Sequence, residues 1–321
     1  MLTSIAAIAG GFVLLVLGAD RFVTGAAAMA RNLGVSPLII GLTIVGFGTS
    51  APEMMVSAIA AWEGNPGLAI GNAIGSNITN IALVMGLTAL VAPLAVNSGM
   101  LRRELPLLLV IMLATLALML DGELSRLDGT ALGVGMLLLI VWIVRLGIKT
   151  RADPMGGDFD AEIPRTMKTA TAFFWLLLGL AVLLGSSKIL VWGAVNVASM
   201  LGVSDEVIGL SIVAIGTSLP ELAASIMSAL KNEHDIAVGN VIGSNMFNLL
   251  GVMAMPGLIA PGVFAPEILV RDFPVMIGLT VAFFVMAAGY GRAGGGRISR
   301  IEGAVLVAVF TGYMVFLYYS P

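Results

Sequence analysis

Charge is scarce in this chain of 321 residues: charged side chains make up 11% of it and hydrophobic side chains 59%. A typical soluble domain carries about 25% charged residues, so this composition excludes a soluble globular protein. The apolar runs are about twenty residues long, which suits membrane-spanning helices. They lack the alternation typical of a transmembrane β-barrel. The sequence therefore predicts an all-α integral membrane protein.

Cysteine is absent, and histidine occurs only once, as His234 in the polar stretch KNEHD. Without cysteine there is no disulfide framework, thiol nucleophile or thiolate metal site. A lone histidine among polar residues is typical of a solvated loop. Since nothing pairs a serine with a base, an enzyme is not expected. Neither is a bound cofactor or a nucleic-acid partner.

One motif occurs twice in the chain. Residues 34–53 read GVSPLIIGLTIVGFGTSAPE and residues 202–221 read GVSDEVIGLSIVAIGTSLPE, and 13 of the 20 aligned positions are identical. A second pair follows in the same alignment, AIGNAIGSNITN at 69–80 and AVGNVIGSNMFN at 237–248. Each copy of the first motif puts a glutamate, Glu53 or Glu221, into an apolar run. A carboxylate in lipid is costly, so these two residues are the first candidates for a functional site.

Ten apolar segments predict ten transmembrane helices, with one composition break after the fifth. We expect the helices at 5–30, 37–62, 68–91, 104–120, 129–148, 169–200, 205–230, 236–258, 273–288 and 301–318. The repeated motifs interrupt the second, third, seventh and eighth of them. Residues 149–168 are charged and rich in glycine and proline, and they are typical of a linker. The predicted domains are a first repeat at 1–148, the linker at 149–168 and a second repeat at 169–321.

An odd number of helices per repeat makes the second half enter the membrane from the opposite side. The predicted fold is therefore two inverted five-helix repeats, related by a pseudo-two-fold axis in the membrane plane. Inverted repeats with interrupted helices at matching positions are typical of secondary transporters, which bind their ions near the midplane. A channel would more naturally repeat about an axis normal to the membrane.

Loop lysines and arginines predict the orientation, because they are enriched on the cytoplasmic side. Under this topology twelve of them fall on one side and only Arg126 and Arg271 on the other. The linker is therefore expected in the cytoplasm, with both termini extracytoplasmic. We expect a multi-pass protein of the cell inner membrane that is surrounded by the lipid bilayer and functions as a monomer.

The motif GTSxPE concentrates oxygen ligands inside an apolar helix. Its hydroxyl groups lie within one turn of the glutamate, and its proline removes a backbone donor, which frees carbonyl groups near 46–48 and 214–216. Hard cations such as Na⁺, Mg²⁺ and Ca²⁺ prefer oxygen ligands, whereas soft transition metals prefer histidine or cysteine. Two carboxylates together match the charge of one Ca²⁺.

The GSN segments are expected to form the remaining walls of this site. Ser76 and Asn80 are four residues apart, as are Ser244 and Asn248, so each pair faces one side of its helix. The neighbouring Asn77 and Asn245 lie about 100° further round the helix, and they are expected to point elsewhere. In the first helix of each repeat, Asp20, Arg21 and Lys188 are expected to form structural pairs or to reach the interface.

These motifs resemble those of a known family. GFGTSAPE with GNAIGSNITN, and AIGTSLPE with GNVIGSNMFN, are similar to the α1 and α2 repeats of the sodium/calcium exchangers in the cation/Ca²⁺ exchanger superfamily. The resemblance covers essentially the whole chain. It implies an antiporter that moves Ca²⁺ against more than one Na⁺, and a first helix of each repeat that slides across the others. The implied cation ligands are Gly46, Thr49, Ser50, Glu53, Ser76, Asn80, Ala214, Thr217, Ser218, Glu221, Ser244 and Asn248.

The coupling ion is less firmly indicated. Calcium/proton exchangers of the superfamily usually carry a GNxxE-type motif where this chain has GTSxPE, which favours the sodium-coupled branch. Some prokaryotic members of the family, and the potassium-dependent exchangers, have Asp where this chain has Asn248. Two carboxylates instead of three argue against K⁺ cotransport and make the site less dependent on protonation. Coupling to H⁺ or K⁺, or transport of another divalent cation, is the alternative.

Overall fold

The structure is a computed structural model, and it describes all residues except 97, 151–166, 203–213, 289–295 and 320–321. The elements up to the predicted linker are α1 (Leu2–Leu33), α2 (Pro37–Ile40), the π-helix η1 (Gly41–Val45), α3 (Gly46–Thr49), α4 (Ala51–Trp62), α5 (Pro66–Thr79), η2 (Asn80–Val84), α6 (Met85–Val91), β1 (Leu94–Val96), α7 (Ser98–Met119), β2 (Glu123–Leu124) and α8 (Arg126–Thr150). Those after it are α9 (Thr169–Met200), α11 (Ala214–Thr217), α12 (Leu219–Leu230), α13 (His234–Phe247), η4 (Asn248–Val252), α14 (Ala254–Ile259), β3 (Gly262–Val263), η5 (Ile268–Asp272), α15 (Phe273–Ala288), β4 (Gly296–Ile298) and α16 (Arg300–Tyr319).

Seven described helical segments are long and apolar enough to cross a membrane, or eight if the bent pair Pro37–Thr49 and Ala51–Trp62 forms one span. The protein is thus a multi-pass membrane protein. In addition, α7 lies at the position of the predicted fourth helix, and α11 with α12 at that of the seventh. The start of that seventh helix and most of the predicted linker lie outside the described residues. The count of ten stays a prediction.

Four helical elements of the first half begin and end at residues that align, in the sequence repeat, with the ends of four elements in the second half. The first and last residues of α3, α4, α5 and η2 align with those of α11, α12, α13 and η4, respectively. The same local sequence therefore produces the same local structure in both halves. Inversion of one half relative to the other stays a prediction.

The helix predicted at 37–62 is interrupted, as expected. It bends by 40° between Thr49 and Ala51, and Pro52 lies in the first turn of α4, where a missing N–H costs little. The predicted third and eighth helices differ from the expectation. Their GNxxGSN segments remain α-helical, and the irregularity is a π-helix that begins at Asn80 or Asn248. Single π turns inside α-helices are frequent at functional sites.

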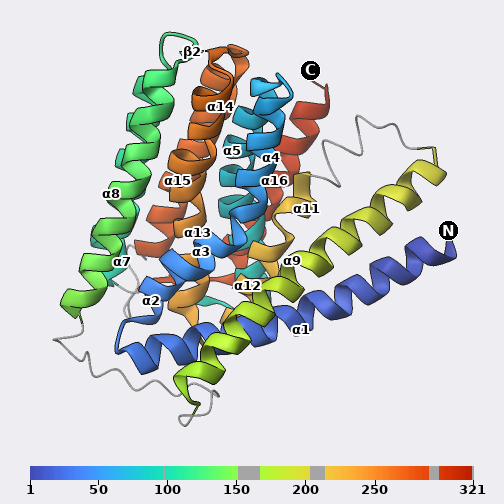
Figure 1. Cartoon of the computed structure of the whole chain (residues 1–321), viewed down its shortest axis with the longest axis vertical. Helices are drawn as coiled ribbons and strands as arrows, with labels where there is room; N and C mark the ends of the chain where they lie inside the picture. The colour runs from blue at the N-terminus through green and yellow to red at the C-terminus, as the bar shows by residue number, and fades with distance from the viewer. Residues whose placement is uncertain (97, 151–166, 203–213, 289–295, 320–321) are drawn as a thin grey trace.

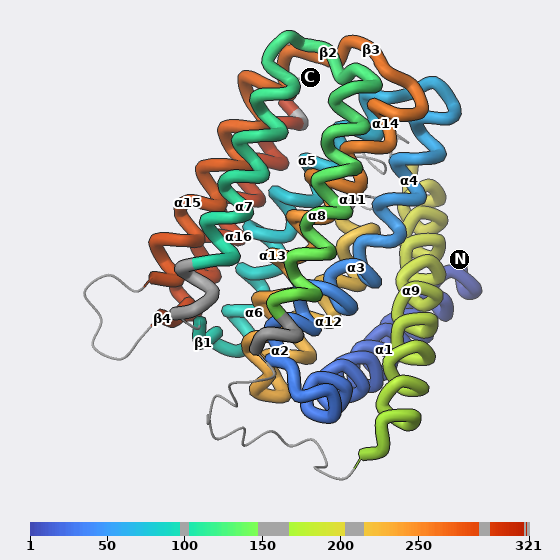
Figure 2. Tube along the Cα trace, turned by 60° about the vertical axis from the view of Figure 1, so that its left-hand side comes forward, coloured from blue at the N-terminus to red at the C-terminus, as the bar shows by residue number. Residues whose placement is uncertain are grey.

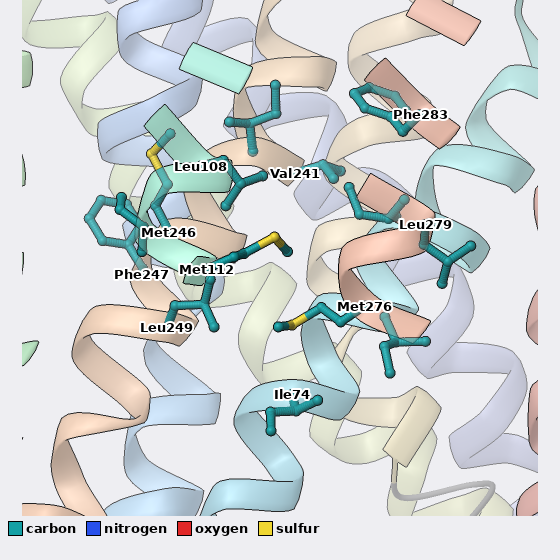
Figure 3. Packing of buried hydrophobic residues seen from close by; sticks show 14 of the residues in the cluster. Ile74, Leu108, Met112, Val241, Met246, Phe247, Leu249, Met276, Leu279 and Phe283 are labelled. Atoms are coloured by element: carbon teal, nitrogen blue, oxygen red, sulfur yellow. The ribbon is translucent and has the colours of Figure 1, made fainter. Parts of the chain in front are cut away.

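The central element is α13, which is enclosed on all sides. In an 18-residue stretch of the segment His234–Ile259 every residue is buried, whereas only 28% of such a stretch is buried in α1 and in α9. Figure 3 shows part of the apolar core around it, where Met246 and Phe247 share one cluster with Met112, Met276 and Phe283. This packing fixes α13 and, with it, the second GSN segment.

Two short antiparallel pairings join the ends of helices. Leu94 of β1 pairs with Ile298 of β4, and Glu123 of β2 with Val263 of β3. The first pairing joins the α6–α7 connection to the segment before α16, and the second joins α7–α8 to the segment after α14. Each pairing therefore holds elements of the two halves together.

Helices α1 and α9 pack against each other and lie obliquely to the remaining bundle in Figure 1, and Figure 2 shows both of them on one side of it. Glycines allow their backbones to approach: a Cβ on Gly25 would lie 2.5 Å from the nitrogen of Leu176, and one on Gly18 would lie 2.8 Å from that of Leu183. Close approach through small residues is typical of membrane helices. We refer to these two helices as the α1–α9 pair.

Candidate functional site

The repeated segments of the two halves meet in the interior. α3 contacts α12 and α13, while α5 contacts α11 and η4, so the motif of each half lies against that of the other. Glu53 and Glu221, in the first turns of α4 and α12, are each 1% exposed. Their carboxyl groups are close enough to interact electrostatically. The two glutamates therefore belong to a single buried cluster.

Buried polar atoms without hydrogen-bond partners concentrate in this cluster. Of the thirteen such side-chain atoms among the described residues, ten belong to the repeated segments. Buried polar groups normally have partners, and an uncompensated buried carboxylate is especially costly. Nine of the ten are oxygens, which a bound cation would satisfy, and the tenth is the Asn248 Nδ2. The ten atoms come from Ser50, Glu53, Asn77, Asn80, Ser218, Glu221 and Asn248.

Threonine side chains cross between the halves. Thr217 lies next to the Glu53 carboxyl group, and Thr49 next to that of Glu221. The Thr49 hydroxyl is also 3.1 Å from the Asn240 Oδ1, to which it can donate, and 3.4 Å from the Ser244 Oγ. Each glutamate thus has a threonine of the other half beside it.

The Gly46 carbonyl is in the cluster, but it is not freed by the helix break. It accepts hydrogen bonds from the Ser50 nitrogen at 3.1 Å and from the Ser244 hydroxyl at 3.3 Å. A helical N–H bonds the carbonyl four residues earlier, so the missing N–H of Pro52 or Pro220 concerns Gly48 or Gly216 and not Gly46. In the second half, the Ser187 hydroxyl of α9 donates to the Gly216 carbonyl at 3.0 Å. The prediction that carbonyl groups near 46–48 are left open is therefore wrong for Gly46. A cation could bind the Gly46 carbonyl oxygen only in addition to these two hydrogen-bond donors.

The remaining predicted residues lie in the same segments. Ser76, in α5, is 6% exposed, and Asn80, at the start of η2, is 1% exposed. Ala214 is the first residue of α11, and its side chain is outside the described part of the structure.

The expectation that Asn245 points elsewhere is wrong. The Asn80 Nδ2 donates to the Asn245 Oδ1 at 3.1 Å, and the Asn245 Nδ2 donates to the carbonyl of Asn77 at 3.4 Å. A helical wheel assigns a residue to a face, but α13 is packed on all its faces, so two neighbouring faces of α13 both meet the ligand segments. Asn245 therefore orients Asn80 and leaves the Asn80 Oδ1 unpartnered.

Two further asparagines support the glutamates and were not predicted. The Asn72 Nδ2 donates to the Glu53 carbonyl at 3.1 Å and to the Ser57 hydroxyl at 2.9 Å. The same arrangement recurs at the aligned positions of the second half. There, the Asn240 Nδ2 donates to the Glu221 carbonyl at 3.2 Å and to the Ser225 hydroxyl at 2.9 Å. The signal was present in the sequence, since all these residues are identical in the two aligned repeats.

The cluster contains two acidic groups and no basic one that pairs with them. No ion pair among the described residues includes Glu53 or Glu221. The described residues also contain no group of three or more His, Cys, Asp or Glu side chains arranged to hold a metal ion. Hydroxyl and amide groups lie in the same segments as the two carboxylates, and hard cations prefer oxygen ligands of these kinds.

Comparisons with known proteins point to one family. The model of the sodium/calcium exchanger protein family matches residues 3–150 and 171–319. The chain is 50% identical over 311 residues to CaxA of Alkalimonas amylolytica, with 97% of each chain covered. It is 40% identical over 325 residues to the inner membrane protein YrbG of Escherichia coli K12, covering 100% of this chain and 99% of that one. A solved structure of the sodium-calcium exchanger NCX_Mj is similar with a TM-score of 0.84 at 31% identity, covering 98% of this chain and 99% of that one.

Proposed function

Because the chain belongs to the sodium/calcium exchanger family, we propose that it exchanges Na⁺ for Ca²⁺ across the membrane at a site between Glu53 and Glu221. The family consists of cation/Ca²⁺ antiporters, with Na⁺ and Ca²⁺ as the transported ions, and not of enzymes. The observation that carries the proposal is the buried cluster of unpartnered oxygen atoms around two carboxylates.

The donor set suits Ca²⁺. This ion takes about 6–8 oxygen ligands, carboxylates and carbonyls among them. The two carboxylates neutralise its charge, and neutral oxygens from both halves complete the coordination. The proposed ligands besides Glu53 and Glu221 are Thr49, Ser50, Ser76, Asn80, Thr217, Ser218, Ser244 and Asn248, with the carbonyls of Gly46 and Ala214.

Exchange follows if the two kinds of ion share these ligands. Na⁺ is also a hard cation, so several Na⁺ ions bound to the same oxygens would displace Ca²⁺. The empty site keeps two uncompensated carboxylates, which makes its passage across the barrier unfavourable. Only a loaded site then crosses, and this condition couples the movement of one ion to that of the other.

Access to the site from alternate sides requires a moving element. The α1–α9 pair is the natural candidate, since it packs mainly on itself and lies obliquely to the bundle that carries the site (Figure 1). In an 18-residue stretch of α1 or α9 only 28% is buried, whereas such a stretch of the segment from α13 to α14 is fully buried. The α13–α14 segment therefore stays fixed. We place the protein in the cell inner membrane as a monomer, with both termini extracytoplasmic.

The test is Ca²⁺ uptake into proteoliposomes with Na⁺, K⁺ and H⁺ gradients imposed one at a time. An outward Na⁺ gradient should drive Ca²⁺ accumulation, whereas K⁺ and H⁺ gradients of the same size should not. Uptake that follows the H⁺ or K⁺ gradient and ignores Na⁺ would instead support the other coupling ions. Mg²⁺ and Mn²⁺ added as competitors measure the selectivity among divalent cations.

A further inference from the structure

Ion pairs attach α1 to the turn between α12 and α13. The Lys231 Nζ lies 2.8 Å from the Asp20 Oδ1, and the Arg31 Nη1 lies 3.7 Å from the Glu233 Oε1. Glu233 is 4% exposed, and while burial raises the pKa of its carboxyl group, Arg31 acts in the opposite direction. α1 also packs along α12. One member of the α1–α9 pair is thus fastened to the bundle at one end of the molecule.

The first of these pairs has a counterpart with its charges exchanged. In the alignment of the two repeats, Lys188 takes the place of Asp20, and Glu63 takes the place of Lys231. Lys188 lies on α9 and Glu63 directly follows α4, so they occupy the repeat-related positions. In Figure 1, α4 ends at the top of the bundle and α12 at the bottom, so the segments that follow these two helices lie at opposite ends of the molecule. An acidic and a basic residue have changed places, yet the attraction between the two positions is kept.

The counterpart pair is not formed in this structure. Lys188 and Glu63 are both exposed, and neither takes part in an ion pair among the described residues. Within the same residues α9 makes no contact with α4 as extensive as that of α1 with α12. The two halves share their local structure but differ in how their first helix meets the bundle.

We propose that Asp20–Lys231 and Lys188–Glu63 are alternating latches, of which one closes each side of the molecule in turn. The inference rests on the proposed exchange function. In transporters built from repeats, alternating access moves one part of the molecule against the other around a fixed site, and the proposal is that this movement exchanges the settings of the two first helices. The α1–α9 pair would then release Lys231 from Asp20 and bring Lys188 to Glu63.

The latches are built to be reversible and unequal. Both pairs are partly or fully exposed, and such pairs contribute little individually, so either can break within a transport cycle. The second contact on α1, Arg31–Glu233, has the uncharged counterparts Ser199 and Asn65 at the repeat-related positions. The side fastened in this structure therefore carries one ion pair more than the other side. This difference favours the observed state when no ions are bound.

Cysteine cross-linking tests the proposal directly, because the chain has no native cysteine. The variants are Asp20→Cys/Lys231→Cys and Lys188→Cys/Glu63→Cys. Each is treated in membranes with a bifunctional thiol reagent whose length equals that of the two side chains it replaces. Both double variants should cross-link, and each cross-link should block Ca²⁺ uptake reversibly if the reagent is cleavable. Asp20→Cys/Glu63→Cys, with its two residues at opposite ends, is the control that should not cross-link.

A third substitution tests the coupling between the latches. Lys231→Gln, added to Lys188→Cys/Glu63→Cys, should raise the rate of cross-linking several-fold, whereas Arg126→Gln should leave it unchanged. The proposal is overturned if Lys188→Cys/Glu63→Cys does not cross-link in a folded, exchanging protein, or if Lys231→Gln has no effect on the rate. Failure of the proposed function is a different result, namely no Na⁺-driven uptake by the unsubstituted chain.

Discussion

At the scale of single residues, the site shows an imbalance between donors and acceptors. Glu53 and Glu221 bring four carboxylate oxygens into the interior, and none of them has a hydrogen-bond partner. The hydroxyls beside them are shared with other acceptors, as that of Thr49 is with Asn240. Such an excess of oxygen is unfavourable in an empty protein interior. It becomes favourable when a cation is present, and for this reason we interpret the cluster as an ion site.

Asn240 holds Glu221 in place through its backbone, and removing the amide should weaken the site. An Asn240→Ala variant leaves the Glu221 carbonyl and the Ser225 hydroxyl without their donor, at a cost of about 1–3 kcal/mol. We expect Ca²⁺ affinity to fall about tenfold or more, since about 1.4 kcal/mol corresponds to a factor of ten.

The measurement is Ca²⁺ titration of the purified protein, with Asn72→Ala as the matched variant in the other half. Both substitutions should weaken binding, because the Nδ2 groups of the two amides donate to equivalent partners, a glutamate carbonyl and a serine hydroxyl. Unchanged affinity in an Asn240→Ala protein that remains folded would contradict a positioning role.

Asn248 decides how strongly the site responds to protons. It is 1% exposed, and neither of its side-chain polar atoms has a partner. An Asn248→Asp variant would bring a third carboxylate into the cluster, and like charges at close range cannot all ionise. Protons should then compete with the transported cations, and Na⁺-driven Ca²⁺ uptake should fall more steeply as the pH is lowered than in the unsubstituted protein. Parallel pH profiles of the two proteins would disprove this.

Most residues that the sequence singled out lie in the buried cluster, where their role as ligands stays a prediction, and the structure explains the exceptions. Repetition in one alignment selects the glutamates, hydroxyls and asparagines without any knowledge of contacts. It does not reveal which faces of a helix are covered. Asn245 was misplaced because α13 is enclosed on all sides, and Asn72 was missed because its partners are a backbone carbonyl and Ser57, on a different helix.

At the scale of elements, the α1–α9 pair depends on glycine. A side chain on Gly25 would meet the backbone of Leu176, so Gly25→Val should separate the helices. The expected loss is about 1–3 kcal/mol, as for other overpacked positions, visible as a lower melting temperature and slower Ca²⁺ uptake.

Gly185 in α9 is the matched control, because a Cβ there would have no atom within 4 Å. Gly185→Val should leave both quantities nearly unchanged. If Gly25→Val and Gly185→Val behave alike, close packing of the two backbones is not required for transport.

Helices longer than twenty residues were predictable from hydropathy, but the short elements were not. A π-helix arises when one extra residue enters a turn, as where the Met253 nitrogen donates to the Asn248 carbonyl at 2.9 Å. The strands β1 to β4 are two or three residues long and exist only because distant helix ends meet. Neither feature has a periodic pattern in the sequence.

At the scale of the whole molecule, one chain contains two similar halves in dissimilar settings. Asp20 of α1 is paired, whereas Lys188 at the related position of α9 is exposed. A sequence repeat predicts that the halves can exchange their roles, but it does not predict which arrangement is found. Under the proposed latches, the state of the molecule depends on small differences between ion pairs, and these are not visible in a motif.

The central claim is that both halves build one ion site and not two. Calorimetric titration of the purified protein with Ca²⁺, at several Na⁺ concentrations, tests it most directly, alongside Glu53→Gln and Glu221→Gln. We predict one Ca²⁺ per chain, displaced by Na⁺, and no measurable binding in either variant. Two Ca²⁺ ions per chain, or one variant that retains near-normal binding, would contradict a shared site.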